Sequence, residues 1–324
     1  PWAHDLLATT PETKGVIGAP PAVRSEGIYL VTKQLSDLMV LYVSEHGHFS
    51  FAPWRGHSLI GPTETNYRGA VEYWCVTRQS VEDFLDRINE TSRLPQAIGI
   101  DDVLTAYGGL RPLVESSSED TYEASRASEL VEHADEGVEG IVTAIGAKYT
   151  TARALAAKTI DRVARTLGAS ASMSHTGEVS LDACGIGILS DAIERARAAW
   201  PDFSEATITH LVRFYGTAYE EVVALTREEP GLAEALDTDG EILAQAVFAV
   251  RHEAAVNLQD VLLRRTGLGT LGDPGGGMFE RVAEVVAREL GWSGERCADE
   301  LAAVKAAVRV PDSLNPRARR EESL

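Results

Sequence analysis

The stretch TAIGAKYTTARALAAKTIDRVARTLG, residues 143–168, joins a short apolar strand to a long alanine-rich helix. The apolar run at 141–145 predicts the strand. The helix is predicted from apolar residues that recur at helical spacing, namely Ala152, Leu155, Ala156, Ile160, Val163, Ala164 and Leu167. Gly146 to Thr151 therefore lies at a helix N-terminus, where backbone N–H groups lack intrahelical partners and the dipole adds partial positive charge.

This junction can be interpreted in two ways. In the first, it is a strand-to-helix turn in which Thr150 or Thr151 caps the helix and Lys148 is solvated. In the second, the backbone N–H groups and the charge of Lys148 bind an anion or a carbonyl oxygen. The turn alone does not decide between them, so residues elsewhere in the chain are needed.

Composition limits the class of protein. The chain has 324 residues, of which 44% are hydrophobic, enough for one large folded domain or two. Its net charge of −19 argues against a nucleic-acid partner, because phosphate binding needs a basic surface. Cys75, Cys184 and Cys297 lie far apart, which predicts reduced thiols, no metal site and a cytoplasmic protein.

No apolar run in the sequence reaches the roughly 20 residues that a membrane-spanning helix requires. No basic-then-apolar signal segment opens the chain either. Any membrane contact is therefore expected to be peripheral.

The first half of the chain has the pattern of an antiparallel sheet. Between residues 24 and 114, short apolar or alternating runs are separated by polar turns; these runs are GIYLVTK, LMVLYVS, HFSFAPW and SLIGPTE. One helix is expected at Val81 to Thr91, with Ser80 as its N-cap. The predicted fold class is therefore α+β, followed by an all-α region.

Beyond the Gly-rich, acidic linker at 175–185, almost every segment has helical periodicity. The expected helices are ILSDAIERARAAW, SEATITHLVRFY, AYEEVVALT, GEILAQAVFAVRHEAAVNLQDVLLRRT, MFERVAEVVAREL and ERCADELAAVKAAV. We therefore predict a first domain at 1–176, a helical C-terminal domain at 177–310 and a polar, flexible tail at 311–324.

Two arginines in the first half are candidates for anion binding. Arg111 follows a Gly-Gly pair and precedes a proline, and Arg126 follows an acidic, serine-rich loop. Guanidinium groups bind phosphate or carboxylate oxygens bidentately and keep their charge at any working pH. The alternative is that Arg111 pairs with a local carboxylate, the candidates being Asp101, Asp102, Glu115 and Asp120.

A collinear series of motifs resembles the C-terminal part of the FAD-dependent glycerol-3-phosphate dehydrogenases that pass electrons to quinone. The series comprises Pro1-Trp2, FAPW with LIGPTET, DDVLTAYGGLRPL, AIGAKYTTAR, HLVRFYGT, AVFAVRHEAAVNLQDVLLRRTGLG and ELGW. The chain contains no GxGxxG between a strand and a helix. The resemblance implies that this nucleotide-binding Rossmann segment lies upstream of Pro1, so that the chain is the remainder of an FAD-dependent oxidoreductase fold with a substrate-domain sheet and a helical cap.

The resemblance assigns roles to residues of both regions. The family's GGK-x-TT turn, which lies against the flavin, corresponds to Gly146, Ala147, Lys148, Tyr149, Thr150 and Thr151. A cation at this position would stabilise negative charge that develops on the reduced ring, so Lys148 is expected to be catalytic. Arg111 and Arg126 correspond to the clamp on the substrate phosphate.

The chain departs from the family at four positions, one of which is Ala152 in place of the tyrosine that typically follows the paired threonines. Ala147 replaces the second glycine of the turn, and its methyl group could crowd the flavin. Tyr29 stands where the family commonly has a histidine, and it is the second catalytic candidate. Glu26 replaces a lysine on the same strand.

The resemblance implies a function for the complete protein. It would oxidise sn-glycerol 3-phosphate to dihydroxyacetone phosphate with FAD as hydride acceptor and membrane quinone as final acceptor. It would work in the cytoplasm or at the inner face of the cell membrane, as a peripheral protein and a homodimer. Two alternatives stay open, which are a glycerol-3-phosphate oxidase that uses oxygen and a non-catalytic fragment that acts as an association module.

Overall fold

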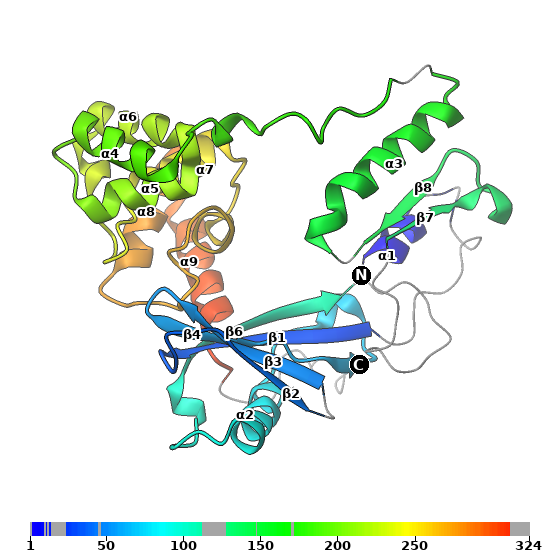
Figure 1. The fold of residues 1–324 in the computed structure, drawn as a ribbon, viewed down its shortest axis with the longest axis horizontal. Coiled ribbons are helices and arrows are strands. Elements are labelled where there is room, and N and C mark those ends of the chain that lie inside the picture. The colour runs from blue at the N-terminus through cyan, green and yellow to red at the C-terminus, as the bar shows by residue number, and fades with distance from the viewer. Residues whose placement is uncertain are drawn as a thin grey trace. The chain divides into compact units, whose positions relative to one another are not determined.

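The computed structural model describes residues 2–9, 11, 13, 24–44, 47–111, 128–146, 148–169 and 172–311. Two compact units are present (Figure 1), and the chain passes from the first to the second between Val179 and Ser180. The second unit ends at Val310. Each unit is described by itself below.

A six-stranded antiparallel sheet forms the main part of the first unit. Its strand order is β2-β3-β4-β1-β5, and β6 also pairs with β1. The strands are β1 (Arg24–Lys33), β2 (Val40–Ser44), β3 (Gly47–Trp54), β4 (His57–Gly61), β5 (Thr65–Tyr67) and β6 (Val103–Arg111). The expected antiparallel sheet is thus confirmed, and β1 is its central strand.

One helix, α2 (Arg78–Ser92), covers one face of this sheet (Figure 1). Its buried residues are Val81, Phe84, Leu85 and Ile88, spaced as one face of a helix. The ring of Phe84 meets that of Phe49 of β3 edge-to-face, with centroids 5.7 Å apart. Side chains alternate along a strand, so the residues of β1 that share this face include Ile28 and Leu30, both fully buried.

The N-terminus of α2 lies earlier than the sequence predicted. Thr77 is the N-cap, and its Oγ1 accepts a hydrogen bond from the Ser80 backbone N–H at 3.0 Å. Ser80 is the third helical residue, and its hydroxyl accepts from the Thr77 N–H at 3.1 Å. The prediction of Ser80 as N-cap was therefore wrong, because the two hydroxyls form a reciprocal capping box one turn earlier.

The stretch at 143–168 contains a strand and a helix, and the strand forms a hairpin with residues 129–132. Strands β7 (Glu129–Glu132) and β8 (Val142–Ile145) pair antiparallel and are followed by α3 (Ala152–Thr166). Arg162 of α3 forms an ion pair with Glu132 of β7. A short helix, α1 (Ala3–Thr9), opens the described chain, and 3₁₀ turns lie at Val71–Tyr73, Ile100–Asp102, His133–Glu136 and Tyr149–Thr151.

A buried histidine fastens the hairpin. His133 Nδ1 lies 2.5 Å from a carboxylate oxygen of Glu136, and its Nε2 lies 2.8 Å from the hydroxyl of Thr143 on β8. Because both ring nitrogens of this 3%-exposed side chain have partners, the polar ring is buried without an orphaned group. His133 thus links the turn after β7 to β8.

The second unit is helical, as expected. Its elements are α4 (Leu189–Ala199), α5 (Glu205–Tyr215), α6 (Tyr219–Glu228), α7 (Ala244–His252), η8 (Asp260–Arg265), α8 (Met278–Leu290) and α9 (Gly294–Val308), with short 3₁₀ turns at Asp182–Cys184, Gly216–Ala218 and Pro230–Ala233. A continuous apolar core joins them, and it includes Leu211, Val247 and Phe279 with no exposed side-chain surface. This unit therefore has a closed core of its own.

The single long helix predicted over residues 240–266 is interrupted in the structure. Helix α7 ends at His252, and Ala254 has a φ of +56°, a left-handed conformation that a continuing helix cannot contain. A new turn starts at Asn257, whose Oδ1 accepts from the Asp260 N–H at 2.8 Å, while the Asp260 carboxylate accepts from the Asn257 N–H at 3.3 Å. This local capping competes with helix continuation, and it leads into the π-helical η8.

Cys75, Cys184 and Cys297 are free thiols. Among the residues that the structure describes, no group of three or more His, Cys, Asp or Glu side chains is arranged to hold a metal ion. The helices of the described part are all too short or too polar to span a bilayer.

Candidate active site

The β1/β6 ladder brings Tyr29 and Arg111 onto one face of the sheet. Tyr29 pairs with Tyr107, Gly27 with Gly109 and Ser25 with Arg111. These are alternate pairs of an antiparallel ladder, so their side chains point to the same side. That side is opposite to the one on which Ile28 and Leu30 are buried.

The guanidinium of Arg111 lies across β1. Its Nη1 donates to the hydroxyl of Ser25 at 2.8 Å and to the carbonyl of Glu26 at 3.1 Å, and its Nη2 donates to the carbonyl of Thr63 at 2.8 Å. The side chain is 22% exposed, and the Glu64 carboxylate lies 3.9 Å away. Arg111 is therefore a fixed cation at the surface of the sheet, held by contacts from β1 and from the loop after β4.

Two of the four carboxylates that the sequence offered to Arg111, Asp101 and Asp102, lie among the described residues. Of these two, Asp102 forms an ion pair with Lys33 at 3.4 Å and accepts a hydrogen bond from the Gly99 N–H at 2.9 Å. The hydrogen bond to Gly99, ahead of the charge of Lys33, lowers the pKa of Asp102. The other candidates, Glu115 and Asp120, lie outside the described residues.

Gly27 is required by this arrangement. A Cβ at residue 27 would lie 2.3 Å from Nη2 of Arg111, so any larger residue would push the guanidinium away from β1. Gly61 is required by Tyr29 in the same way, since a Cβ there would lie 2.5 Å from Cδ1 of the tyrosine ring. The side chains of Arg111 and Tyr29 therefore each pack over a glycine.

Tyr29 stacks on Tyr107 across the two strands. The ring centroids are 5.9 Å apart and the planes differ by 17°. Burial, with a smaller contribution from the neighbouring Tyr29, raises the pKa of the Tyr107 phenol. The pair therefore presents two phenol groups on the face that carries Arg111. The phenol of Tyr107 is protonated at neutral pH.

Glu26 does not share this face. Its carboxylate accepts a hydrogen bond from the indole N–H of Trp74 at 2.8 Å. Residue 26 is an odd number of positions from residues 25, 27 and 29, so its side chain projects to the other side of the sheet. Replacement of the family's lysine by Glu26 thus places no carboxylate side chain beside Tyr29.

The turn at 146–151 is described apart from Ala147, which lies outside the described residues. Lys148, Thr150 and Thr151 are exposed, and Tyr149 is 99% exposed. Thr151 is the N-cap of α3, but its hydroxyl donates to the carbonyl of Lys148 at 3.1 Å and accepts no capping hydrogen bond. The helix N-terminus is therefore preceded by a 3₁₀ turn that displays Lys148 and Tyr149 to the solvent.

Gly146 lets α3 approach the end of β8, because a Cβ at this position would lie 2.8 Å from Cδ2 of Leu155. Arg126 falls outside the described residues. The convergence of Lys148, Arg111 and Arg126 on one substrate stays a prediction.

Several residues of the Arg111 face escaped the sequence reasoning. Ser25, Thr63 and Tyr107 lie in three separate segments, and each touches Arg111 or Tyr29. The sequence placed Arg111 in a turn, whereas it ends strand β6, and Tyr107, four residues earlier in that strand, shares its face. Thr63 could not have been found, because its position depends on the loop after β4.

Three comparisons relate the chain to known proteins. Residues 145–297 match the family model described as the C-terminal domain of alpha-glycerophosphate oxidase. The chain is 31% identical to a glycerol-3-phosphate dehydrogenase of Mycobacterium leprae over 88% of its own length and 48% of the relative's. It is 30% identical to a glycerol-3-phosphate dehydrogenase of Synechocystis over 79% of its length and 46% of the relative's. The chain thus spans about half the length of these curated relatives.

A solved structure extends the similarity to the fold. The glycerol-3-phosphate dehydrogenase from Bacillus halodurans, determined in complex with FAD, superposes with a TM-score of 0.74. It covers 95% of this chain and 60% of the Bacillus protein, at 20% identity. The resemblance inferred from the motifs is therefore confirmed: the chain is similar to glycerol-3-phosphate dehydrogenases, and its own residues 145–297 match the C-terminal domain of alpha-glycerophosphate oxidase.

Proposed function

We propose that the complete protein containing this chain oxidises sn-glycerol 3-phosphate to dihydroxyacetone phosphate, with FAD as hydride acceptor and quinone as final acceptor. The observation that carries the proposal is the Arg111 guanidinium, fixed beside Tyr29 on the sheet face. The names of the curated relatives support the choice of substrate and reaction class.

Arg111 has the chemistry that a phosphate monoester requires. Its planar donor groups match phosphate oxygens, and its charge does not depend on pH in the working range. The contacts with Ser25 and Thr63 fix the guanidinium before substrate arrives, so little side-chain entropy is lost on binding. Binding energy from the remote phosphate then positions the carbinol carbon for reaction. Arg126 is proposed as the second arm of this clamp.

The turn at 146–151 fits one edge of a flavin. The fit rests on an exposed lysine beside a helix N-terminus, because both favour the carbonyl oxygens and the negative charge of a pyrimidine ring edge. Gly146, Ala147, Lys148, Tyr149, Thr150 and Thr151 would hold FAD, which supplies a hydride acceptor when bound. The charge of Lys148 would stabilise negative charge that develops during the reaction.

Tyr29 is proposed to act at the substrate alcohol. A phenol hydroxyl can donate or accept a hydrogen bond, so it can orient the hydroxyl group of the carbon that is oxidised. Its place on β1, two alternate register pairs from the Arg111 pair, puts it on the same face of the sheet as Arg111. This geometry supports a role for Tyr29 in the same site as Arg111.

The electron acceptor and the cellular setting are further parts of the proposal. A quinone acceptor requires access to the bilayer, which suggests a cytoplasmic protein held peripherally at the inner face of the membrane. A homodimer is proposed on the family resemblance. An oxidase that uses oxygen is the alternative, and the family model's own description, an alpha-glycerophosphate oxidase, favours keeping it. Hydrogen peroxide formed in proportion to substrate oxidised would favour the oxidase.

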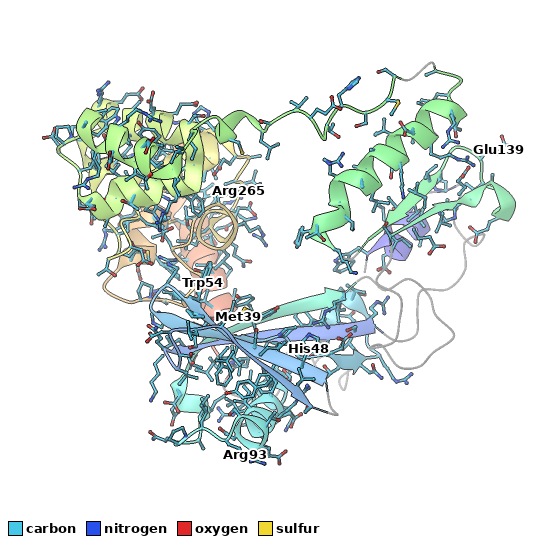
Figure 2. All side chains as sticks on the ribbon, in the orientation of Figure 1. Met39, His48, Trp54, Arg93, Glu139 and Arg265 are labelled. Atoms are coloured by element: carbon cyan, nitrogen blue, oxygen red, sulfur yellow. The ribbon has the colours of Figure 1, made fainter. Side chains whose placement is uncertain are left out.

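The experiment uses the complete protein. Glycerol 3-phosphate should bleach its flavin absorbance and drive dye reduction, and no response at millimolar substrate would refute the proposal. Arg111→Ala should raise KM for glycerol 3-phosphate at least tenfold, because a charged hydrogen-bonding partner of the phosphate is removed. The control is Arg93→Gly, which removes a charge at the left-handed C-cap of α2 (Figure 2) and should leave KM unchanged.

The second candidate function, a non-catalytic association module, draws on α3. None of its side chains is buried among the described residues, and Ile160 is 65% exposed. An amphipathic helix whose apolar face is only half-buried, at Leu155 and Val163, fits an association role. A complete protein that binds a partner yet neither FAD nor glycerol 3-phosphate would favour this candidate.

A further inference from the structure

On the sheet face that carries Arg111, Tyr107 has not yet been given a role. Tyr107 and its partner Tyr29 lie at one end of three alternate register pairs, and Arg111 with Ser25 lies at the other. The middle pair is Gly27 and Gly109. Two aromatic rings and one cation are therefore separated on this face by a pair of glycines.

The two glycines differ in what lies over them. Gly27 is covered by the guanidinium of Arg111, which a Cβ would meet at 2.3 Å. Gly109 is open, because a Cβ there would meet no atom of the described residues within 4 Å. Packing among the described residues therefore does not demand a glycine at 109, and within this part of the chain the position leaves space between the tyrosine pair and the cation.

The rings beside this space are set by their surroundings. Tyr29 lies against Gly61 and stacks on Tyr107 at 5.9 Å, so neither ring is a loosely held surface group. Tyr107 nevertheless remains 43% exposed. The pair thus offers a rigid apolar surface that ends in two hydroxyl groups.

We propose that Tyr107, with Gly109 beside it, forms the part of the site that receives the hydroxylated carbons of a short polyol phosphate whose phosphate lies on Arg111. This inference rests on the proposed function and deepens it. The phenol of Tyr107 hydrogen-bonds a substrate hydroxyl, and the open position at Gly109 admits the carbon chain between phosphate and phenol. Tyr107 is a positioning and specificity residue, which selects polyol phosphates over phosphate alone.

The chemistry explains why this selection needs both features. Arg111 binds any phosphate oxygen, so by itself it does not distinguish glycerol 3-phosphate from inorganic phosphate. A phenol that hydrogen-bonds a substrate hydroxyl adds binding energy that a ligand without the matching group does not gain, so the site favours ligands that carry it. A methyl group at residue 109 would occupy space that only the longer ligand uses.

The test measures binding of two ligands to the complete protein by calorimetry, with glycerol 3-phosphate and inorganic phosphate as probes. Tyr107→Phe and Gly109→Ala are each expected to raise Kd for glycerol 3-phosphate about tenfold, the effect of one lost hydrogen bond or one steric conflict. Kd for inorganic phosphate should change less than twofold. Tyr42→Phe is the matched control, because its ring packs on Phe49 and Phe51 of the α2-covered face.

Each outcome bears on the proposal. Unchanged Kd for glycerol 3-phosphate in both variants would overturn it, as would equal losses for both ligands or no binding of glycerol 3-phosphate by the unaltered protein. Selective losses accompanied by no oxidation of glycerol 3-phosphate would support the inference and refute the proposed function. The two failures are therefore distinguishable.

Discussion

Helices α3 and α8 have similar lengths and are both amphipathic, yet they differ in how far their apolar stripes are buried. Helix α8 buries Met278, Phe279, Val282, Ala283, Val285 and Val286 in the core of the second unit. Helix α3 buries none of its residues among the described part of the chain, and Leu167 just beyond its C-terminus is 75% exposed. Among the described residues, the stripe of α8 is buried, whereas that of α3 is at most half-buried.

The difference teaches that amphipathic spacing indicates a need for a partner surface and does not say where that surface lies. Isolated helices of this length are marginal in water, so α3 depends on contacts that cover its stripe. In the described residues, those contacts come from β8 and the ion pair with Glu132. Helix α3, which follows the turn at 146–151, is thus stabilised by fewer contacts than α8.

The largest expected effect tests this difference directly. Phe279→Ala should lower the free energy of unfolding of the second unit by about 3–5 kcal/mol, because a fully buried aromatic side chain leaves a cavity. Ile160→Ala in α3 should change the free energy of unfolding by less than about 0.5 kcal/mol in this chain. Urea denaturation monitored by circular dichroism measures both. Comparable losses would show that the α3 stripe is already covered.

The sheet was largely predictable because its strands alternate and its turns are polar. The runs around β1, β3 and β4 each predicted a strand that the structure contains. What escaped prediction was the pairing order, in which β1 lies between β4 and β6 although the chain passes through α2 before reaching β6. That order depends on contacts far apart in sequence, which local patterns do not encode.

The candidate site shows the same limit. Arg111 was identified from its motif, but its contacts with Ser25 and Thr63 arise only when β6 pairs with β1.

The break after His252 was missed for a different reason. Helical periodicity continued through the segment, while the capping pair of Asn257 and Asp260, visible in the sequence, decided the local structure.

A smaller effect on stability is expected on the sheet face that carries Arg111, where the two glycines of one register pair can be compared. Gly27→Ala should destabilise the first unit by about 1–3 kcal/mol, because the added methyl group and the Arg111 guanidinium cannot occupy the same space. Gly109→Ala, its register partner, should have almost no effect on stability. Thermal unfolding of the two variants makes the comparison, and equal destabilisation would mean that the open space at Gly109 is filled.

A pH-dependent effect is expected in the second unit. Burial raises the pKa of Glu253, and the charges of Arg265 and His252 oppose this only in part. Among the described residues, its Oε2 atom has no hydrogen-bond partner. The native state therefore binds the proton more tightly than the unfolded chain, and Glu253 makes stability fall as pH rises from the ordinary glutamate range through the raised native pKa.

Glu253→Gln should remove this contribution. The variant should lose less stability than the unaltered chain between mildly acidic and neutral pH, with a difference of about 1 kcal/mol or less. Denaturant titrations at a series of pH values measure it. Glu295→Gln, an exposed position in the first turn of α9, serves as control. Parallel pH profiles for the Glu253 variant and the unaltered chain would refute the assignment.

The smallest effect on stability is expected at the turn before α3, where function and folding separate most clearly. Lys148 is exposed, so Lys148→Gln should change the free energy of unfolding by less than about 0.5 kcal/mol. In the complete protein the same variant should lower kcat about a hundredfold, because a preorganised cation next to developing charge is lost. Lys158→Gln, an exposed lysine two turns into α3, should leave kcat unchanged. If both lysine variants kept full activity, the turn would be structural, and the comparison would reduce to one helix with a core and another without.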